Sequence, residues 1–352
     1  AMAFIAAGVF VGLIGSVAWL AGQAFPRAAV PLALCVFALG ATTAAVPSLQ
    51  PFMPWGWVGL IYPTLGTPHL LAALAALATA LVLVVPVLMN RLALEKLMAQ
   101  AVRWDSAALN ATVMDFGAAT AIYRRRPHLG RRLRAVRPLG RQAAVFLVRD
   151  AIGATRTPGR LIVGVLALVV SGALITLALA PATPGWALGA TAGLVLFAGL
   201  GPLTDGIRHA VHVAADFPIY GFSDGVLLAN HMLFPLTVVV IVLFATVITG
   251  SLLLGNSVTV PVVGSLILGA LALIARVSSA LKGPMPPALL TPMTTPMGDL
   301  GAGVRLIWAL EGVLFASLIG ASVALALQSP ILLVSVAVSL VGVGLHRWRH
   351  RV

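Results

Sequence analysis

The stretch RTPGRLIVGVLALVVSGALITLALA, residues 156–180, opens with two arginines and then carries no charge from residue 161 to residue 180. About 20 apolar residues in a helix span the hydrocarbon core of a bilayer. The stretch therefore predicts a transmembrane helix over 160–180 with its charged end at one membrane surface. Lysine and arginine collect in the cytoplasmic loops of membrane proteins, so the arginines also orient this helix.

The composition of the whole chain fits that environment. Of its 352 residues, 60% are hydrophobic and 9% are charged, and the mean hydropathy is +1.06. Soluble domains carry roughly 25% charged residues, so this chain predicts an all-α integral membrane protein, a polytopic helical bundle. We attribute the net charge of +13 to membrane orientation rather than to nucleic-acid binding. Cys35 is the only cysteine, which excludes an intrachain disulfide and a cysteine metal cluster.

Nine apolar runs predict spanning helices. A further segment, 47–68, is apolar but contains five prolines, and proline interrupts helices. We expect this segment to form a re-entrant or interfacial hairpin, with Trp55 and Trp57 at headgroup depth. The predicted spans are 3–25, 28–46, 69–90, 160–180, 186–203, 226–250, 258–277, 304–327 and 329–346.

This helix count places all 22 lysines and arginines on one side of the membrane. The segments left on the other side contain neither residue; they are 47–68, 181–185, 251–257 and residue 328. We therefore expect a multi-pass protein with a cytoplasmic C-terminus. Arginine replaces lysine almost throughout, in an Ala/Gly/Val-rich chain, and this favours the plasma membrane of a high-GC bacterium. The same count puts Ala1 outside without a secretory signal, so we expect further helices before it.

An arginine-rich segment, 91–159, precedes the last six spans. Within it, 138–156 is amphipathic, because Gln142, Arg149 and Arg156 recur every seven residues beside Val145, Phe146, Val148 and Ile152. This pattern predicts an interfacial helix lying in the membrane plane. It serves either as an anchor on anionic lipid or as an additional docking element. We do not expect RNA binding, because no aromatic residues alternate with the arginines.

The loop 204–222 predicts a short amphipathic helix that begins near Asp205, which can cap it. Arg208 and His212 are four residues apart and share one face, and Ile207, Ala210, Val211 and Ala214 line the other. Such a helix suits contact with a peripheral protein, or it lies on the surface with no partner. The next cytoplasmic loop, 278–303, is rich in proline and reads as a rigid irregular strap.

Two stretches resemble ABC-2-type (type V-like) export permeases. Residues 143–175, AAVFLVRDAIGATRTPGRLIVGVLALVVSGALI, resemble the opening of such a permease, and PPALLTPMTTPMGDLGAGVRLIW, residues 286–308, is similar to large fused actinobacterial members. The resemblance implies an ABC-2-type permease fold in which 1–90 ends a first half, 91–159 is a linker with the connecting helix, and 160–352 is a second half. The last outer loop, at Gln328, departs from the family because it is too short for a re-entrant hairpin.

The resemblance also implies a function. The chain would be the transmembrane subunit of an ATP-driven exporter that moves a substrate outward. ATP and Mg would be bound by two copies of a separate nucleotide-binding subunit. The other partners of the chain would be further permease or accessory subunits and the lipid around the spans. The chain has no G-x-x-x-x-G-K-[ST] motif, as expected for a subunit without its own ATPase. The resemblance assigns the coupling loop to Asp205, Ile207, Arg208, Val211, His212 and Phe217, and the connecting helix to Arg141, Arg149, Asp150 and Arg156.

Polar residues inside spans are candidate pathway residues, because burying a charge in lipid costs at least about 2.5–3.5 kcal/mol. Glu311 is one, with an ion pair to Arg305 or His346 as the alternative interpretation. Asn230 and His231 are the others, with packing or interfacial anchoring as their alternative. Gly189-x-x-x-Gly193 predicts close helix packing.

We expect no catalytic residue, no bound metal or cofactor, and no nucleic-acid partner. The sequence lacks D-x-D, D-D-x-x-D and H-E-x-x-H, which membrane transferases and zinc proteases need. The alternative function is an ion- or proton-coupled carrier, or a membrane scaffold that does not transport.

Overall fold

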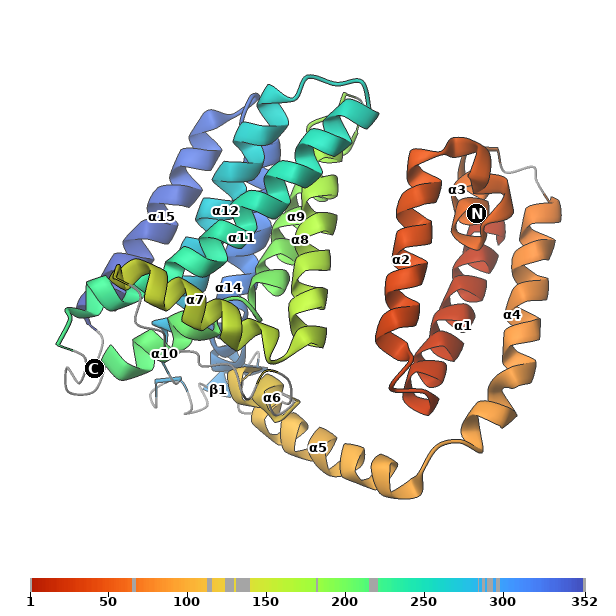
Figure 1. The fold of residues 1–352 in the computed structure, drawn as a ribbon, viewed down its shortest axis with the longest axis horizontal. Coiled ribbons are helices and arrows are strands. Elements are labelled where there is room, and N and C mark those ends of the chain that lie inside the picture. Colours follow the sequence, from red (N-terminus) through yellow and green to blue (C-terminus); the bar gives the residue numbers. More distant parts are fainter. Residues whose placement is uncertain are drawn as a thin grey trace. The chain divides into compact units, whose positions relative to one another are not determined.

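The computed structural model describes residues 2–64, 68–112, 116–123, 130, 140–181, 183–214, 221–283, 285–286, 289, 294–295 and 298–350. Contacts between residues divide the chain into two units, Ala1–Asp105 and Ser106–Val352. Both units are built from helices (Figure 1).

The first unit packs α1 against α4, with the short α3 beside them. Ala7, Leu70 and Leu74 are buried at its centre, and Trp57 packs against them. Its elements are α1 (Met2–Ala24), α2 (Ala29–Ala45), the 3-10 helix η1 (Pro47–Phe52), α3 (Pro54–Thr64), α4 (Pro68–Met89) and the first part of α5 (Leu94–Thr112).

The proline-broken segment forms η1 followed by α3. Its tight fold depends on Gly56, because a Cβ atom at that position would overlap the backbone of Gln50. The indole of Trp57 donates a hydrogen bond to the carbonyl of Pro51 (2.7 Å), while Trp55 stays exposed. Helix α3 has 11 residues and is too short to cross a bilayer. This length agrees with a re-entrant or interfacial hairpin, which does not cross.

The second unit is a bundle of six long helices with shorter helices at one end (Figure 1). Its core is aliphatic and includes Leu168, Leu196, Leu243, Leu268 and Ile319, all fully buried. Its elements are α6 (Phe116–Ile122), α7 (Gln142–Thr155), α8 (Pro158–Ala178), α9 (Gly185–Leu200), α10 (Asp205–Ala214), α11 (Asp224–Leu253), α12 (Thr259–Ala280), α14 (Leu300–Ala324), α15 (Pro330–Arg349) and the antiparallel pair β1 (Thr294–Thr295) and β2 (Gly298–Asp299).

Every predicted span coincides with a helix. In the described residues, seven helices are long and apolar enough to cross a membrane: α1, α4, α8, α11, α12, α14 and α15. The other two are shorter, since α2 has 17 residues and α9 has 16. Helix α9 is long and apolar enough to cross a membrane only when it is taken together with the start of α10, from which it is bent by 70°. The helical membrane class is thus confirmed, and the β1–β2 pair adds two strands of two residues each.

The charged residues that the structure describes in the second unit lie at one end of its bundle, which we call the basic end. The six long helices alternate in direction, so the starts of α8, α11 and α14 meet the ends of α9, α12 and α15. Arg160, Arg276, Arg305 and Arg347 all lie at these termini. At the opposite end, the described residues 179–181, 183–185, 254–258 and 325–329 contain no charged side chain.

The first unit has the same asymmetry. Arg27 lies between α1 and α2, and Arg91 follows α4. The guanidinium of Arg91 lies over the ring of Phe25, 4.9 Å from its centroid, which brings the two connections to the same end of the unit. Among the described residues, the arginines that flank the predicted spans therefore lie at one end of each unit.

The closest helix contact in the bundle is between α9 and α14. A Cβ atom at Gly193 would overlap the carbonyl of Ala316, and one at Gly320 would overlap the carbonyl of Gly189. The predicted role of Gly189-x-x-x-Gly193 is confirmed, because small residues let two helix backbones touch.

Replacing Gly193 by valine should separate α9 from α14, because the obstacle is backbone and cannot rotate away. Overpacking costs about 1–3 kcal/mol, and we expect the upper part of this range for the free energy of unfolding. Thermal unfolding of the purified protein in detergent measures the effect. Gly342→Val is the control, since no atom lies within 4 Å of a Cβ built there. Equal losses in both variants would contradict the α9–α14 contact.

Candidate functional site

Helix α10 lies at the basic end, beyond the bend that follows α9. It begins at Asp205 rather than after it, so Asp205 is part of the helix and not a cap residue before it. Its carboxylate accepts a hydrogen bond from Arg160 Nη1 at the start of α8 (2.9 Å). Arg208, one turn along, lies 3.9 Å from the same carboxylate. The first turn of α10 is thereby tied to the first long helix of the bundle.

A buried pair joins α7 to α11. His231 Nδ1 and Asp150 Oδ2 are 2.7 Å apart, with side-chain exposures of 0% and 10%. A carboxylate can only accept from this nitrogen, so the contact fixes a proton on Nδ1. The other ring nitrogen, Nε2, is buried with no hydrogen-bond partner in the described part of the chain. Phe146 of α7 contacts the imidazole edge-on, at 4.9 Å between ring centroids.

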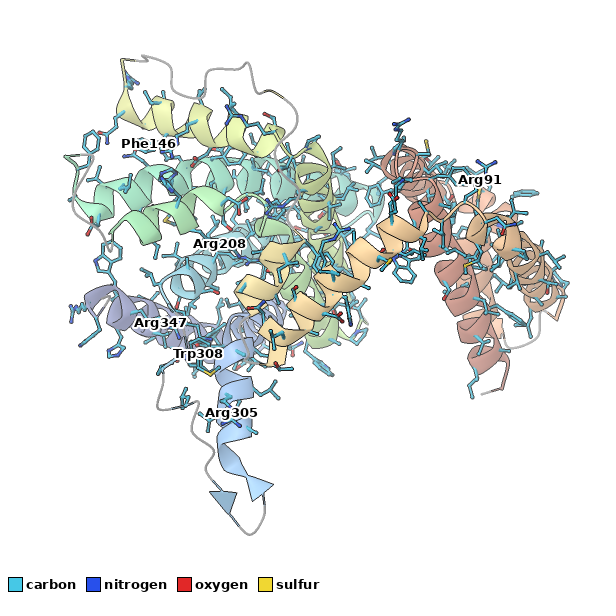
Figure 2. All side chains as sticks on the ribbon, turned by 90° about the horizontal axis from the view of Figure 1, so that it is seen from below. Arg91, Phe146, Arg208, Arg305, Trp308 and Arg347 are labelled. Atoms are coloured by element: carbon cyan, nitrogen blue, oxygen red, sulfur yellow. The ribbon has the colours of Figure 1, made fainter. Side chains whose placement is uncertain are left out.

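Helix α10 covers this pair. A Cβ atom at Gly206 would lie 2.5 Å from Asp150 Oδ2 and 2.6 Å from His231 Nδ1, so only glycine fits. Beside it, Ala210 packs with Phe146 and Leu227 in a small apolar cluster. Helices α7, α8, α10 and α11 therefore meet at one place, which we call the junction. Its residues are Phe146, Asp150, Arg160, Asp205, Gly206, Ala210, Leu227 and His231. Figure 2 labels Phe146 of the junction and the neighbouring Arg208 of α10.

Arg276 fixes the end of α12 near the junction. Its guanidinium lies over the ring of Phe197, 3.7 Å from the centroid, and donates to the carbonyl of the same residue. The cation thus satisfies the carbonyl end of α9, where helix carbonyls lack partners.

A second charged cluster surrounds Glu311 on α14. Its Oε2 lies 2.5 Å from Arg347 Nη2 and 3.4 Å from Lys282 Nζ. Arg347 also donates to the carbonyl and hydroxyl oxygens of Ser278 (both 3.1 Å), and Lys282 lies 3.8 Å from the centroid of the Trp308 ring. Burial lowers the pKa of Lys282, Glu311 opposes that shift, and Arg347 adds to it. Glu311 is held as the shared anion of two cations.

Glu311 does form ion pairs, but the predicted partners, Arg305 and His346, were wrong. Arg305 donates instead to the carbonyl of Leu289 (3.2 Å), and the cation from α15 is Arg347 rather than His346. Arg305 is six residues before Glu311 on the same helix, and residues at that spacing do not share a face.

The candidate coupling residues of α10 differ from one another in burial. Ile207 is fully buried, so it faces the bundle, while Val211 is half-buried and the Arg208 side chain is 32% exposed. His212 lies in α10, and Phe217 lies outside the described residues. On the connecting helix, Asp150 enters the junction, Arg149 and Arg156 are half-buried, and Arg141 is exposed just before the helix.

The candidate pathway residues do not converge. His231 is part of the junction, and Glu311 is part of the second cluster. The amide of Asn230 donates to the carbonyl of Val226 in its own helix (2.9 Å). The His231–Asp150 and Arg160–Asp205 pairs were not predicted, because each joins residues far apart in the sequence.

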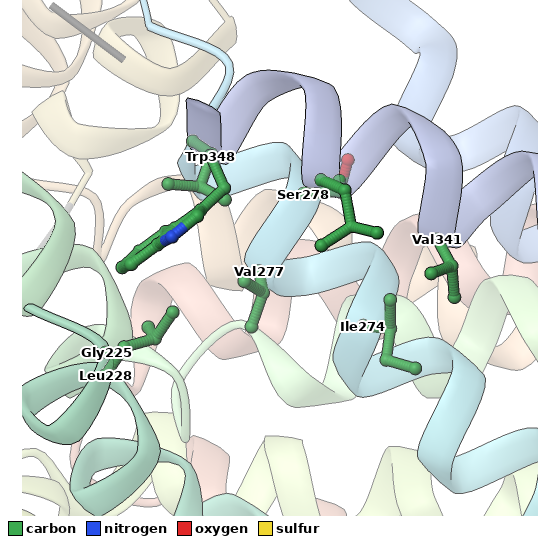
Figure 3. A pocket seen from close by; sticks show the side chains of 10 residues that line it. Gly225, Leu228, Ile274, Val277, Ser278, Val341 and Trp348 are labelled. Atoms are coloured by element: carbon green, nitrogen blue, oxygen red, sulfur yellow. The ribbon is translucent and has the colours of Figure 1, made fainter. Parts of the chain in front are cut away.

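An apolar groove of about 410 Å³ lies between α11, α12 and α15 at the basic end (Figure 3). Trp348 closes it towards α11, with its ring 4.0 Å from a Cβ built on Gly225. Ser278 is its polar wall, and that side chain is also bound by Arg347. The remaining lining residues are Leu228, Ile274, Val277, Leu281, Val341, Gly344 and Leu345.

No family model, curated protein or solved structure matches this chain. Within the described residues, no three side chains of His, Cys, Asp or Glu gather as metal ligands. The contacts that the structure describes at the basic end are ion pairs and hydrogen bonds between helices.

A double-mutant cycle on Asp150→Ala and His231→Ala should give a coupling energy of about 1.5–3 kcal/mol in unfolding experiments, because the pair is buried and charge-assisted. The same cycle on Arg160→Ala and Asp205→Ala is the matched comparison. That pair is more exposed, so about 0.2–1 kcal/mol is expected. A coupling energy for Asp150 and His231 no larger than the exposed pair's would contradict the junction as described.

Glu311→Gln should destabilise the protein by about 2 kcal/mol, because it leaves two partly buried cations without their shared anion. Arg305→Gln is the control, since Arg305 contacts Leu289 instead. Thermal unfolding of both variants measures the difference. If the Arg305 variant lost as much stability as the Glu311 variant, the assignment of partners would be wrong.

Proposed function

We propose that this chain is the transmembrane permease subunit of an ATP-driven ABC exporter, with an ABC-2-type permease fold. On this proposal the basic end faces the cytoplasm of a bacterium. ATP and Mg bind to separate nucleotide-binding subunits, present in two copies, and the chain itself is not an enzyme.

The observation that carries the proposal is the way α10 is mounted. Its buried residues Ile207 and Ala210 face the bundle, while Arg208 on the other side reaches solvent. A short helix that is solvated on one face and clamped on the other suits contact with a peripheral protein. The positive-inside rule assigns this end to the cytoplasm, where ATP is available.

The junction gives a route for movement of α10. A push on α10 bears on the Asp150–His231 pair through Gly206, because no space separates them. The pair joins α7 to α11, and the Asp205–Arg160 pair joins α10 to α8. A displacement imposed by a motor subunit would therefore act on three helices at once.

The distribution of charge argues against a proton- or ion-coupled carrier. Such carriers place ionisable side chains along the path through the membrane. In the described part of the second unit, the acidic, basic and histidine residues lie at the basic end. Glu311, the deepest candidate, is already bound by Arg347 and Lys282.

Affinity purification of the chain from its native membrane, extracted mildly, should recover a subunit with a G-x-x-x-x-G-K-[ST] motif. Arg208→Glu should reduce that recovery about tenfold, which corresponds to about 1.4 kcal/mol of binding free energy. Quantitative mass spectrometry of the ATP-binding subunit measures the ratio.

Arg349→Glu is the matched control, because it reverses a charge at the same end of the bundle on a different helix, α15. It should leave the recovery unchanged. The exporter proposal fails if the unmodified chain recovers no ATP-binding subunit. The role of α10 fails if both variants behave alike.

A further inference from the structure

Helix α5 carries an apolar stripe that its own unit leaves uncovered. Leu94, Met98, Val102 and Trp104 have exposed fractions of 71%, 63%, 64% and 66%, and Leu97 has 37%. At about 100° per residue, these five side chains occupy one half of the helix circumference. Asp105 interrupts the apolar stripe on this face.

The opposite half of the same stretch is polar. Glu95, Lys96, Gln100 and Arg103 lie there, and Arg103 also donates to the carbonyl of Ala99 (3.0 Å). An amphipathic helix with basic residues on the polar face and tryptophan and leucine on the other is typical of a helix lying in a membrane interface.

The connection to α4 places α5 next to the bilayer. Only residues 90–93 separate the end of α4 at Met89 from the start of α5 at Leu94. An extended chain of that length reaches no more than about 18 Å. Helix α4 is one of the helices long and apolar enough to cross a membrane, and its exposed apolar surface includes Leu83, Val87 and Met89. The stripe on α5 follows this exposed apolar surface in the chain after only four residues.

The anchoring of the linker supports the same arrangement. Arg91 lies over the ring of Phe25, so residue 91 is held beside the connection between α1 and α2. Both connections are at one end of the first unit, where a membrane surface would lie. Helix α5 therefore starts at the level of the headgroups.

We propose that α5 lies in the plane of the membrane surface. Leu94, Met98, Val102 and Trp104 enter the acyl-chain region, and Lys96 and Gln100 remain in the aqueous and headgroup layer. The occupant of the apolar stripe is lipid, because only four residues separate α5 from a helix long and apolar enough to cross a membrane, whose own exposed apolar side chains require lipid. The linker between the units is thus anchored to the bilayer along part of its length, independently of any ATP-binding partner.

Nitroxide labels on the full-length chain test this. The single Cys35 is first replaced by serine, and one cysteine is then introduced as Met98→Cys, Val102→Cys, Lys96→Cys or Gln100→Cys. Residues 96 and 98 form a matched pair, since both are exposed and lie on nearly opposite faces. The protein is reconstituted in vesicles of equal parts phosphatidylcholine and phosphatidylglycerol. Collision rates with oxygen, which dissolves in lipid, and with a water-soluble nickel chelate are then measured.

Labels at 98 and 102 should collide more often with oxygen than with the chelate, by several-fold relative to labels at 96 and 100. The reverse ratio should hold at 96 and 100. If all four labels collide freely with the chelate, α5 lies in water and the proposal is wrong. If labels at 98 and 102 are shielded from both reagents, protein rather than lipid covers the stripe, and the proposal is equally wrong. None of the substituted side chains is buried, so failure of the fold is not expected to obscure the result.

Discussion

The arrangement of this protein depends on the cost of placing a charged side chain in hydrocarbon. That cost is at least a few kcal/mol for each isolated charge, which is comparable to a large part of a protein's net stability. In the second unit, the described charges collect at one end of the bundle, most of them near helix termini. The opposite end carries none in the loops that the structure describes, and towards it α9 and α14 meet through small residues, with Gly189 against Gly320.

Gathering charge at one end creates a second requirement, because neighbouring cations repel unless anions or helix carbonyls separate them. The basic end meets this need with a few shared groups. Glu311 lies between Arg347 and Lys282, Asp205 accepts from Arg160, and Arg276 uses a backbone carbonyl and an aromatic ring. Each of these contacts joins different helices, so compensating the charge also fixes the helix ends relative to one another. The rigidity of the basic end is thus a consequence of its composition.

This rigidity matters for the proposed export function. A coupling helix works only if its displacement is passed on rather than absorbed by soft packing. Gly206 removes the side chain that would separate α10 from the Asp150–His231 pair, and the apolar contacts of Ala210 fill the space beside it. The buried Nε2 of His231 marks the cost of such close packing, since a buried polar atom without a partner is unfavourable. The apolar groove beside Trp348 is a neighbouring region where α11, α12 and α15 leave space.

The sequence by itself determined the membrane class, the places of the helices and the one-sided charge, because each depends on local runs of residues and on their order. It also located α7 and α10, whose amphipathic patterns are local. It did not lead us to α5, although the stripe from Leu94 to Trp104 is present in the sequence, because the arginines that follow dominated the interpretation of the linker. Only the tertiary structure decided which charges meet. Asp150 and His231 are 81 residues apart, and the choice of Arg347 over His346 depends on a rotation of about 100° between adjacent residues of α15. Pairing of this kind follows from how helices rotate and pack against each other, which no local pattern specifies.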